Sequence, residues 1–472
     1  MRLLKNAKIA VLLPLIIVAS ACDDLVLEPH SAVSNDAYFK QIGDYEAAII
    51  GVYDQISIAD YYGRSLYLMA DIMGEDVKQN GSANRYQEFA DFEGQIVTGH
   101  GFEQELWAEG YEGINMLNMI IQAEFDGPTS VQADYQQIMG EVYALRGLIY
   151  FDLVRMYGQH YTFTSGGAHP GVPIVLEPDV TLLPARNTVG EVYTQAISDL
   201  TRGISMMSQT RGGSFMMTAS AAQAVLSRIY LYMEDWANVV TMSNSVISSG
   251  RYALVEGQAY VDQFKAGGSS EAIFEIQNTD TDGNNALGSM YRATGYGDYL
   301  PAKDLLDLID PADVRMQMFQ IDPGLAGIYA SYRVMKWPSS TSTDNIPVIR
   351  LSEVYLNRAE AHARSGNTAG AQADLNMIRQ RGLSSAPAVV ATGQALLDAI
   401  ALERRIELGY EGHRIHDLMR YKMDINRVDV TGDVAFMGYP CQFCILPIPQ
   451  YETDANPNMT QGERFSSTVP QQ

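Results

Sequence analysis

A helical repeat of apolar residues runs through the segment 141–158 (EVYALRGLIYFDLVRMYG). Apolar residues recur there three or four positions apart, which places them on one stripe of a helix. The members of this stripe are Leu145, Ile149, Leu153 and Met156. Gly158 follows them and is suited to a left-handed helix end. The pattern predicts a helix that faces a core.

Further helices are predicted from their ends and turns. Thr188-Val-Gly-Glu191 has the spacing of a capping box, so a helix is expected to begin there and continue to about Met207. Two segments have the pattern of helix, short turn, helix: 218–250, with its turn at 234–235, and 349–382, with its turn at 365–367. Tetratricopeptide hairpins have this form, and so does any antiparallel helix pair. The pattern predicts a mainly helical fold and does not distinguish the two.

Loop-rich stretches separate the predicted helices. They cover residues 162–173, 209–215, 266–271 and 279–299. Long irregular segments in a compact protein usually carry function, so we expect the helices to form a scaffold and these loops a working surface. The chain also contains 28 tyrosines, several of them among polar residues and glycines, where a flat amphipathic ring can meet a ligand.

The N-terminus has the pattern of a secretory signal. Three basic residues precede an uncharged apolar run that ends in Ala19-Ser20-Ala21. The run is too short to span a bilayer of about 30 Å, and Pro14 interrupts it. Ala19-Ser20-Ala21-Cys22 resembles a lipobox, which predicts removal of residues 1–21 and acylation of Cys22. Several acyl chains, at about 0.8 kcal/mol for each buried CH₂, would anchor the protein firmly. The alternative is an ordinary secreted protein with a free thiol.

Size and charge narrow the possible functions. A chain of 472 residues with 47% hydrophobic content is long enough to bury a large core. Its formal net charge is −24, and removal of three basic residues with the signal would make it more negative still. A polyanionic partner is therefore disfavoured, which argues against nucleic-acid binding.

The remaining cysteines, Cys441 and Cys444, predict a structural pair. A redox motif would need a strand-to-helix context, and a zinc site would need two more ligands nearby. Residues 436–449 have an extended pattern, in which side chains three apart point to opposite faces. A disulfide would therefore need a local turn, and the sequence leaves open whether the pair is bridged or free.

Three groups of polar residues could suggest catalysis or metal binding. Glu403, Glu407 and Glu411 share a helical face, but arginines beside them make an ion-paired helix surface the better interpretation. His413, His416 and Asp417 lack a third distant metal ligand, so packed or solvated histidines are expected. Residues 280–284 (DTDGN) resemble a calcium loop without the spacing of an EF-hand. We therefore predict no catalytic residues, no metal and no cofactor.

Five ordered motifs make the chain resemble the SusD/RagB family of outer-membrane nutrient-binding lipoproteins. The resemblance covers nearly all of the mature sequence. The motifs are Trp107-x3-Tyr111-x2-Ile114-x3-Asn118; the helix from Arg146 to Gly158, with Gly147 in place of the usual alanine; Arg350 to Ala361 with Asn376, Arg379 and Arg381; Glu403 to Arg420; and Pro447-Ile-Pro449 with Asn456-Pro457 and Gln461.

The resemblance implies a single SusD-like unit over residues 22–472, with an N-terminal part at about 23–260 and a C-terminal part at about 270–472. It implies four tetratricopeptide-like helix pairs in a superhelical scaffold with an irregular ligand-binding face. It also implies a lipid-anchored protein at the cell surface, which captures a glycan or another oligomeric nutrient and covers a SusC-like, TonB-dependent transporter as its lid. Asp23-Asp24 resembles an acidic signal for export to the cell surface.

The loops offer candidate glycan contacts. Sugars stack their C–H faces on aromatic rings and bond their hydroxyls to amide, carboxylate or guanidinium groups. Two regions combine such groups: Tyr61, Tyr62, Asp76, Asn80, Arg85 and Tyr86, and Tyr291, Tyr296, Asp298 and Tyr299. Trp107 is omitted because its helical motif makes it a core residue. For each single tyrosine, ordinary packing is the competing interpretation.

Three other functions stay open at this point. A surface glycoside hydrolase would need two converging acids on separate elements. A helical-repeat adaptor would hold the transporter without binding a small ligand. A lid of a peptide importer would use similar aromatic loops, so the sequence does not identify the ligand.

Overall fold

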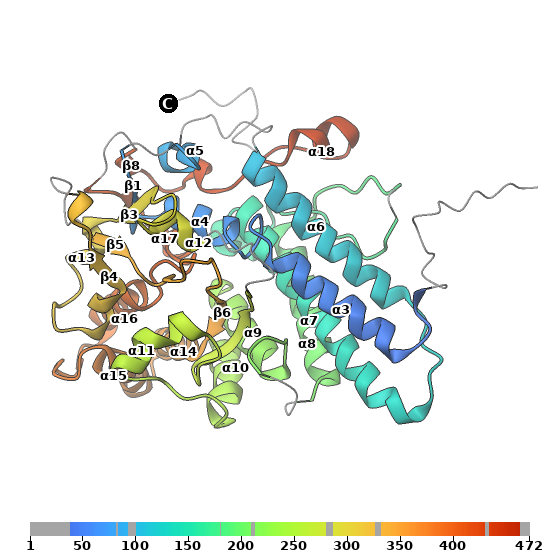
Figure 1. Ribbon diagram of the computed structural model, residues 1–472, viewed down its shortest axis with the longest axis horizontal. Coiled ribbons are helices and arrows are strands. Elements are labelled where there is room, and N and C mark those ends of the chain that lie inside the picture. The colour runs from blue at the N-terminus through green and yellow to red at the C-terminus, as the bar shows by residue number, and fades with distance from the viewer. Residues whose placement is uncertain are drawn as a thin grey trace, which may run out of the picture.

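The computed structural model describes residues 38–81, 84–92, 101–179, 181–208, 213–279, 287–325, 332–429 and 434–462. Helices dominate this part of the chain, and the strands are short (Figure 1). The mainly helical fold is thus confirmed, whereas the tetratricopeptide-like superhelix stays a prediction. The signal segment and Cys22 lie outside the described residues. Within those residues, no helix is both long enough and apolar enough to cross a membrane.

Four long helices form one side of the molecule (Figure 1). They are α3 (Ile42–Ser57), α6 (Gly101–Gln122), α7 (Gln132–Tyr157) and α8 (Val189–Met206). Helix α7 is the central member, since it packs against the other three. It is buried on all sides from residue 137 onward, so the predicted stripe is only part of a fully enclosed helix. The capping box at Thr188 is confirmed: its hydroxyl accepts from the Glu191 N–H at 3.2 Å, and Glu191 caps it in return.

The two predicted helix pairs are confirmed. The first pair is α9 (Ala219–Tyr232) and α10 (Trp236–Ser248), and the second is α14 (Leu351–Arg364) and α15 (Thr368–Gly382). In each turn a polar side chain caps the second helix, because Asp235 accepts from the Asn238 N–H and Asn367 from the Gly370 N–H. Helix α10 packs on α14, so the two pairs form one helical layer with α16 (Gly393–Glu407) beside it.

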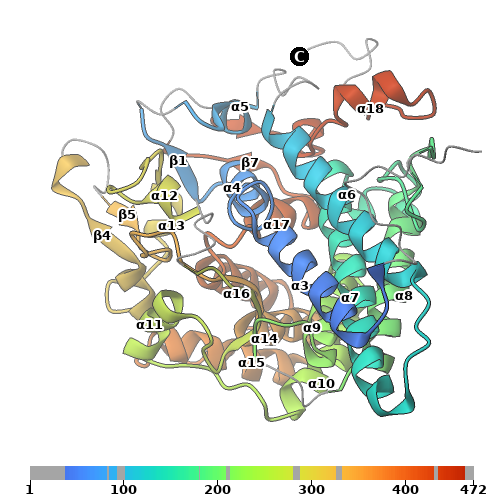
Figure 2. The same cartoon turned by 45° about the vertical axis from the view of Figure 1, so that its right-hand side comes forward.

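Short antiparallel strand pairs hold the irregular segments together, and the first two pairs join segments that lie far apart in the sequence. The pairs are β1 (Val77–Gln79) with β3 (Tyr299–Pro301), β2 (Ala272–Ile276) with β6 (Ile346–Arg350), β4 (Phe319–Ile321) with β5 (Tyr332–Val334), and β7 (Ile425–Asn426) with β8 (Phe436–Met437). All except β2–β6 gather on the side opposite the long helices (Figures 1 and 2). The irregular part of the molecule is therefore held by short ladders.

Shorter helices complete the described chain. They are α4 (Ser65–Ile72), α5 (Gln87–Asp91), α11 (Gln258–Ala266), α12 (Leu287–Tyr291), α13 (Lys303–Leu306), α17 (Arg414–Arg420) and α18 (Gln450–Ala455). The 3₁₀ turns are η2 (Thr129–Val131), η3 (Tyr161–Phe163), η4 (Ser165–Gly167), η5 (Val314–Met318), η6 (Pro323–Leu325) and η7 (Gln442–Cys444).

Local details differ from the sequence prediction. Helix α7 begins at Gln132, nine residues before the apolar repeat, because its first turns are polar and only partly buried. Gly158 has an extended backbone with φ of −126°, so it ends the helix without a left-handed cap. The stretch 279–299 is not a plain loop, since α12 and the start of β3 lie within it.

Candidate ligand-binding surface

The β1–β3 ladder brings the two predicted ligand regions together. Gln79 pairs with Tyr299, and the Asn80 N–H continues the ladder by donating to the Asp298 carbonyl at 2.7 Å. The Asn80 side chain also donates to the Gly297 carbonyl at 3.2 Å. The segments around residues 80 and 297 are thus held side by side at the end of this ladder.

Tyr296 and Arg85 form the exposed part of this surface. The Arg85 guanidinium lies over the Tyr296 ring, 4.0 Å from its centroid. Its Nη1 donates to Asp298 Oδ2 at 2.9 Å. The Tyr296 residue is 55% exposed and the Arg85 side chain 45%, whereas the Asp298 side chain is only 6% exposed. A buried carboxylate therefore orients an arginine, which in turn supports one face of an exposed ring. We call these three residues the Tyr296 platform.

The backbone beneath the ring is fixed. The N–H groups of Tyr296 and Gly297 both donate to the Ser289 carbonyl, at 2.7 and 3.0 Å. Gly297 has φ of +61°, and a Cβ there would lie 2.7 Å from Arg333 Nη1. Arg333 itself donates to the Gly297 carbonyl at 2.8 Å. Sequence reasoning missed Arg333, because no local pattern connects it to a glycine 36 positions earlier in the chain.

Tyr299 and Asn80 support the platform from below. The Tyr299 hydroxyl donates to the Arg85 carbonyl at 2.6 Å, and its side chain is fully buried. Asn80 is partly buried and bonds the tip loop as described above. Both residues therefore bond the backbone that carries the platform.

The other tyrosines proposed as ligand contacts are interior residues. Tyr61 and Tyr62 are each 1% exposed, and the Tyr62 hydroxyl donates to Asp152 Oδ2 at 2.6 Å. Burial is the main reason that the pKa values of both phenols lie well above their usual range, and the Asp152 carboxylate adds to it. These two rings belong to the core, so we remove them from the candidate site.

Tyr86, Tyr291 and Asp76 are buried as well. The Tyr86 ring stacks on Phe102 with centroids 3.8 Å apart, and its hydroxyl accepts from Arg64 Nε at 2.6 Å. Tyr291 bonds Asp71 at 3.3 Å, and Asp76 accepts from Arg405 Nε at 2.7 Å. All three have internal partners and little exposed area, so they too leave the candidate site.

The three glutamates that suggested catalysis form a buried ionic cluster. Glu403 and Glu407 lie on α16, whereas Glu411 follows the helix end, and each is at most 3% exposed. The expected ion pairing is confirmed, but the expected helix surface is wrong. Their partners come from other elements: Arg315 Nη1 with Glu403 at 2.6 Å, Arg381 Nη2 with Glu407 at 2.6 Å, and Arg350 Nη2 with Glu411 at 2.8 Å.

Electrostatics in this cluster do not resemble those of a glycosidase acid pair. Burial raises the pKa of Glu407, but Arg381, Arg350 and Arg315 outweigh it and hold that pKa well below its usual range. Burial raises the pKa of Glu403 despite Arg315. Both carboxylates are enclosed by guanidinium groups, so they do not face a cleft in which a sugar could lie.

Of the candidate metal residues, His413 and Asp417 are buried and His416 is partly buried. His413 Nε2 lies 3.7 Å from Glu353, and burial, reinforced by Arg228 and Arg404, holds the pKa of His413 well below its usual range. In the part of the chain that the structure describes, His, Cys, Asp and Glu side chains form no group of three that could hold a metal ion. Residues 280–284 lie outside the described residues.

Cys441 and Cys444 form a disulfide. The 3₁₀ turn η7 supplies the local bend that an extended segment would lack, and it brings the two Cα atoms to 5.4 Å. Of the two states that the sequence left open, the structure shows the bridged one.

Comparisons with known proteins agree with this architecture. A family model described as "Starch-binding associating with outer membrane" matches residues 32–231, and a model described as "SusD family" matches residues 326–464. A SusD-like protein of Formosa agariphila is 23% identical, with 98% of this chain and 99% of that protein covered. The starch-binding protein SusD of Bacteroides thetaiotaomicron is 30% identical over 156 residues, which cover 30% of this chain and 27% of that protein.

Solved structures match along almost the whole chain. A putative sugar binding protein from Bacteroides vulgatus has a TM-score of 0.83 at 30% identity, with 91% of this chain and 100% of that chain covered. A SusD superfamily protein from Bacteroides thetaiotaomicron has a TM-score of 0.82 at 29% identity, with coverage of 89% and 99%. These matches, together with the two family models, show that the chain belongs to the SusD/RagB family.

Proposed function

We propose that the protein is a lipid-anchored, non-enzymatic nutrient-binding protein of the outer membrane, and that it captures an oligosaccharide on the Tyr296 platform. The observation that carries this proposal is an exposed aromatic ring whose position is fixed before any ligand arrives. An immobile ring loses little conformational entropy on binding, so more of its stacking energy contributes to affinity. The names of the family and of its relatives, which refer to starch and sugar binding, support a glycan as the ligand.

The chemistry of the platform suits a sugar. One face of the Tyr296 ring is supported by Arg85, and the side chain is still 55% exposed, which leaves ring area for the C–H face of a pyranose. Arg85 has five N–H donors, and Nη1 is directed at Asp298. Its other N–H groups can donate to sugar hydroxyls beside the stacked ring.

The membrane and transporter parts of the proposal rest on the sequence and the family. Cys22 in its lipobox would supply the anchor, and a SusC-like TonB-dependent transporter would be the partner that receives the nutrient. Cys22→Ser should release the protein from membranes, and a variant that stays membrane-bound would contradict the anchor. Co-purification of the transporter with the wild-type protein, but not with unrelated lipoproteins, would test the partner.

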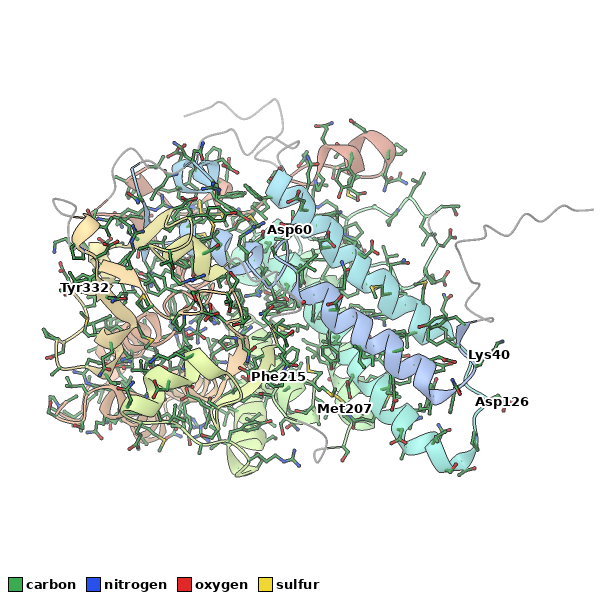
Figure 3. The ribbon with its side chains drawn as sticks, viewed as in Figure 1. Lys40, Asp60, Asp126, Met207, Phe215 and Tyr332 are labelled. Atoms are coloured by element: carbon green, nitrogen blue, oxygen red, sulfur yellow. A yellow bond between two sulfur atoms is a disulfide. The ribbon has the colours of Figure 1, made fainter. Side chains whose placement is uncertain are left out.

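The binding site is tested with Tyr296→Ala and a matched control. The control is Tyr38→Ala, because Tyr38 is also exposed, at 45%, and lies two residues before Lys40. Figure 3 shows Lys40 at one end of the molecule and Tyr332, from the β5 strand that contacts β3, at the other. Loss of one aromatic stack of about 0.5–1.5 kcal/mol would weaken binding roughly 2- to 12-fold.

The assay is calorimetry or gel retardation of the protein without residues 1–22, against a panel of polysaccharides and peptides. We expect Tyr296→Ala to weaken polysaccharide binding and Tyr38→Ala to leave it unchanged. If both variants bind the polysaccharide with the same affinity, the Tyr296 platform is not the binding site. Binding of peptides alone would favour a peptide importer, and reducing sugar released from a bound polysaccharide would favour a hydrolase.

A further inference from the structure

A small, largely enclosed cavity lies where α7, α9 and α17 meet the disulfide turn. Its walls include Arg155 on α7, Tyr232 on α9 and His416 on α17, and Cys444 closes it on the side of the C-terminal segment. The space available to the centre of a water molecule is about 20 Å³. The cavity therefore has room for an ordered water molecule.

Three buried polar atoms around this cavity lack a hydrogen-bond partner among the described residues. They are Arg155 Nε, Gln159 Oε1 and Tyr232 Oη. Arg155 is 8% exposed and Tyr232 is 3% exposed, and Gln159 is partly buried with its Oε1 shielded from solvent, so bulk water does not satisfy the three atoms. A buried polar group without a hydrogen-bond partner destabilises the folded state, so three such atoms at one cavity point to a guest that bridges them.

Neighbouring atoms of the Arg155 and Gln159 side chains are already engaged. Gln159 Nε2 donates to the Cys441 carbonyl at 3.0 Å, so the amide oxygen is the acceptor that is left over. Arg155 Nη2 donates to Asp152, which leaves its Nε–H as a donor. His160 also borders the cavity, but its two ring nitrogens are engaged with Thr162 at 3.1 Å and Tyr439 at 2.8 Å.

Another wall residue, His416, is neutral. Burial lowers the pKa of its imidazole well below the usual range, and the neighbouring Arg155 adds to this effect. A neutral imidazole presents one donor and one acceptor. The cavity therefore offers a donor from Arg155, an acceptor from Gln159, and the hydroxyl of Tyr232 and the ring of His416, which can each play either role.

We infer that this cavity is a binding site for one structural water molecule, held by Arg155 Nε, Gln159 Oε1 and Tyr232 Oη. Water has two donors and two acceptors, which is the set that these atoms require. An anion would be repelled by the Gln159 carbonyl oxygen and the nearby Asp152 carboxylate, and a cation by the Arg155 guanidinium. The water would join the helical core to Gln159, and through Gln159 to the Cys441–Cys444 turn.

The sign of a stability change distinguishes a hydrated cavity from a dry one. In a hydrated cavity Tyr232→Phe removes a hydrogen bond to the water and lowers the melting temperature. In a dry cavity the same change removes an orphaned hydroxyl and raises the melting temperature. Tyr230→Phe, two residues earlier on the same helix and only partly buried, serves as the matched control and should change little.

A crystal structure at about 1.5 Å resolution, with and without a bromide soak, supplies the direct test. We expect a spherical peak within about 2.7–3.2 Å of the three named atoms and no anomalous bromide signal there. A bromide peak would overturn the inference in favour of an anion site. A dry cavity, or a direct bond between Arg155 and Gln159, would overturn it as well.

Discussion

The buried pair of Arg228 and Glu353 allows a quantitative test of how the core is held together. Arg228 Nε and Nη2 donate to the two carboxylate oxygens of Glu353, each at 2.6 Å, and Nη2 also donates to the Val348 carbonyl at 2.6 Å. Both side chains are at most 2% exposed. Arg228→Met keeps an unbranched apolar chain and removes the charge and all three donated bonds.

The magnitude follows from what remains around Glu353. The other basic groups beside it are the neutral His413, with Nε2 at 3.7 Å, and Arg404, with Nη2 at 4.0 Å, and both are too far for a hydrogen bond. Removal of one partner from a buried ion pair costs about 3–5 kcal/mol, because the other charge stays buried and uncompensated. We expect Arg228→Met to lower the free energy of unfolding by this amount at pH 8.

The difference in the free energy of unfolding between Arg228→Met and the wild type should become smaller at acidic pH. In the wild-type protein burial, with Arg228 as the next cause, lowers the folded-state pKa of His413 far below the unfolded value of 6.5. The folded protein therefore binds fewer protons than the unfolded chain at this site, and wild-type stability falls as pH drops below about 6.5. In the variant the repelling Arg228 guanidinium is gone, and Glu353 favours protonation of His413. The pKa of His413 is then less depressed, so the variant loses less stability than the wild type as the pH falls.

The assay is urea unfolding of wild type and variant between pH 8 and pH 5. Arg251→Met, at an exposed position, serves as the control and should change stability by at most about 0.5 kcal/mol. A variant within 1 kcal/mol of wild type at pH 8 would refute the argument about the buried charge. A difference that grows toward pH 5 would refute the coupling to His413.

Other expectations concern packing, the disulfide and the ligand. Gly203→Ala would place a Cβ 2.6 Å from the Gly140 carbonyl between α7 and α8, so we expect a loss of about 1–3 kcal/mol in thermal unfolding. Its control is Gly43→Ala in the first turn of α3, which meets nothing within 4 Å and should change stability by at most about 0.5 kcal/mol. Replacement of both Cys441 and Cys444 by alanine should lower the free energy of unfolding by about 2 kcal/mol, the chain-entropy value for so short a loop. Thiol titration of the denatured, unreduced wild-type protein without Cys22 should find no free thiol. Neutral polysaccharides should bind better than acidic ones of equal length. The net charge of the protein is strongly negative, and the Asp298 carboxylate balances the positive charge of Arg85. Tighter binding of acidic polysaccharides at low salt would contradict this expectation.

Local features of the fold could be predicted because their causes are local. The capping box at Thr188 and the turns at 234–235 and 365–367 place helix ends within a residue or two of those in the structure. Each depends on a few neighbouring side chains and on the apolar period around them. The same logic explains the error at the start of α7, where the first turns are polar and have no apolar repeat to mark them.

The burial of Glu403, Glu407 and Glu411 could not be predicted from the sequence, because its cause is not local. Spacing of four along a helix looks the same on a solvated surface and in a buried cluster. The difference is made by Arg315, Arg350 and Arg381, which precede their partners by 26 to 92 residues and reach them only in the folded chain. Burial of such charges is a property of tertiary pairing.

Tyrosine illustrates the same limit at the ligand surface. The side chain has an apolar body and one hydroxyl, so it is stable in a core wherever the fold supplies an acceptor, as Asp152 does for Tyr62. Polar neighbours in the sequence therefore do not mark an exposed ring, because those neighbours can be the buried acceptors. Tyr296 differs in its backbone: it stands between two glycines, Gly295 and Gly297, on a tip whose N–H groups bond the Ser289 carbonyl. These two hydrogen bonds hold the tip with its ring outside the core, and the flanking glycines are the local feature that distinguishes Tyr296 from the tyrosines that the structure buries.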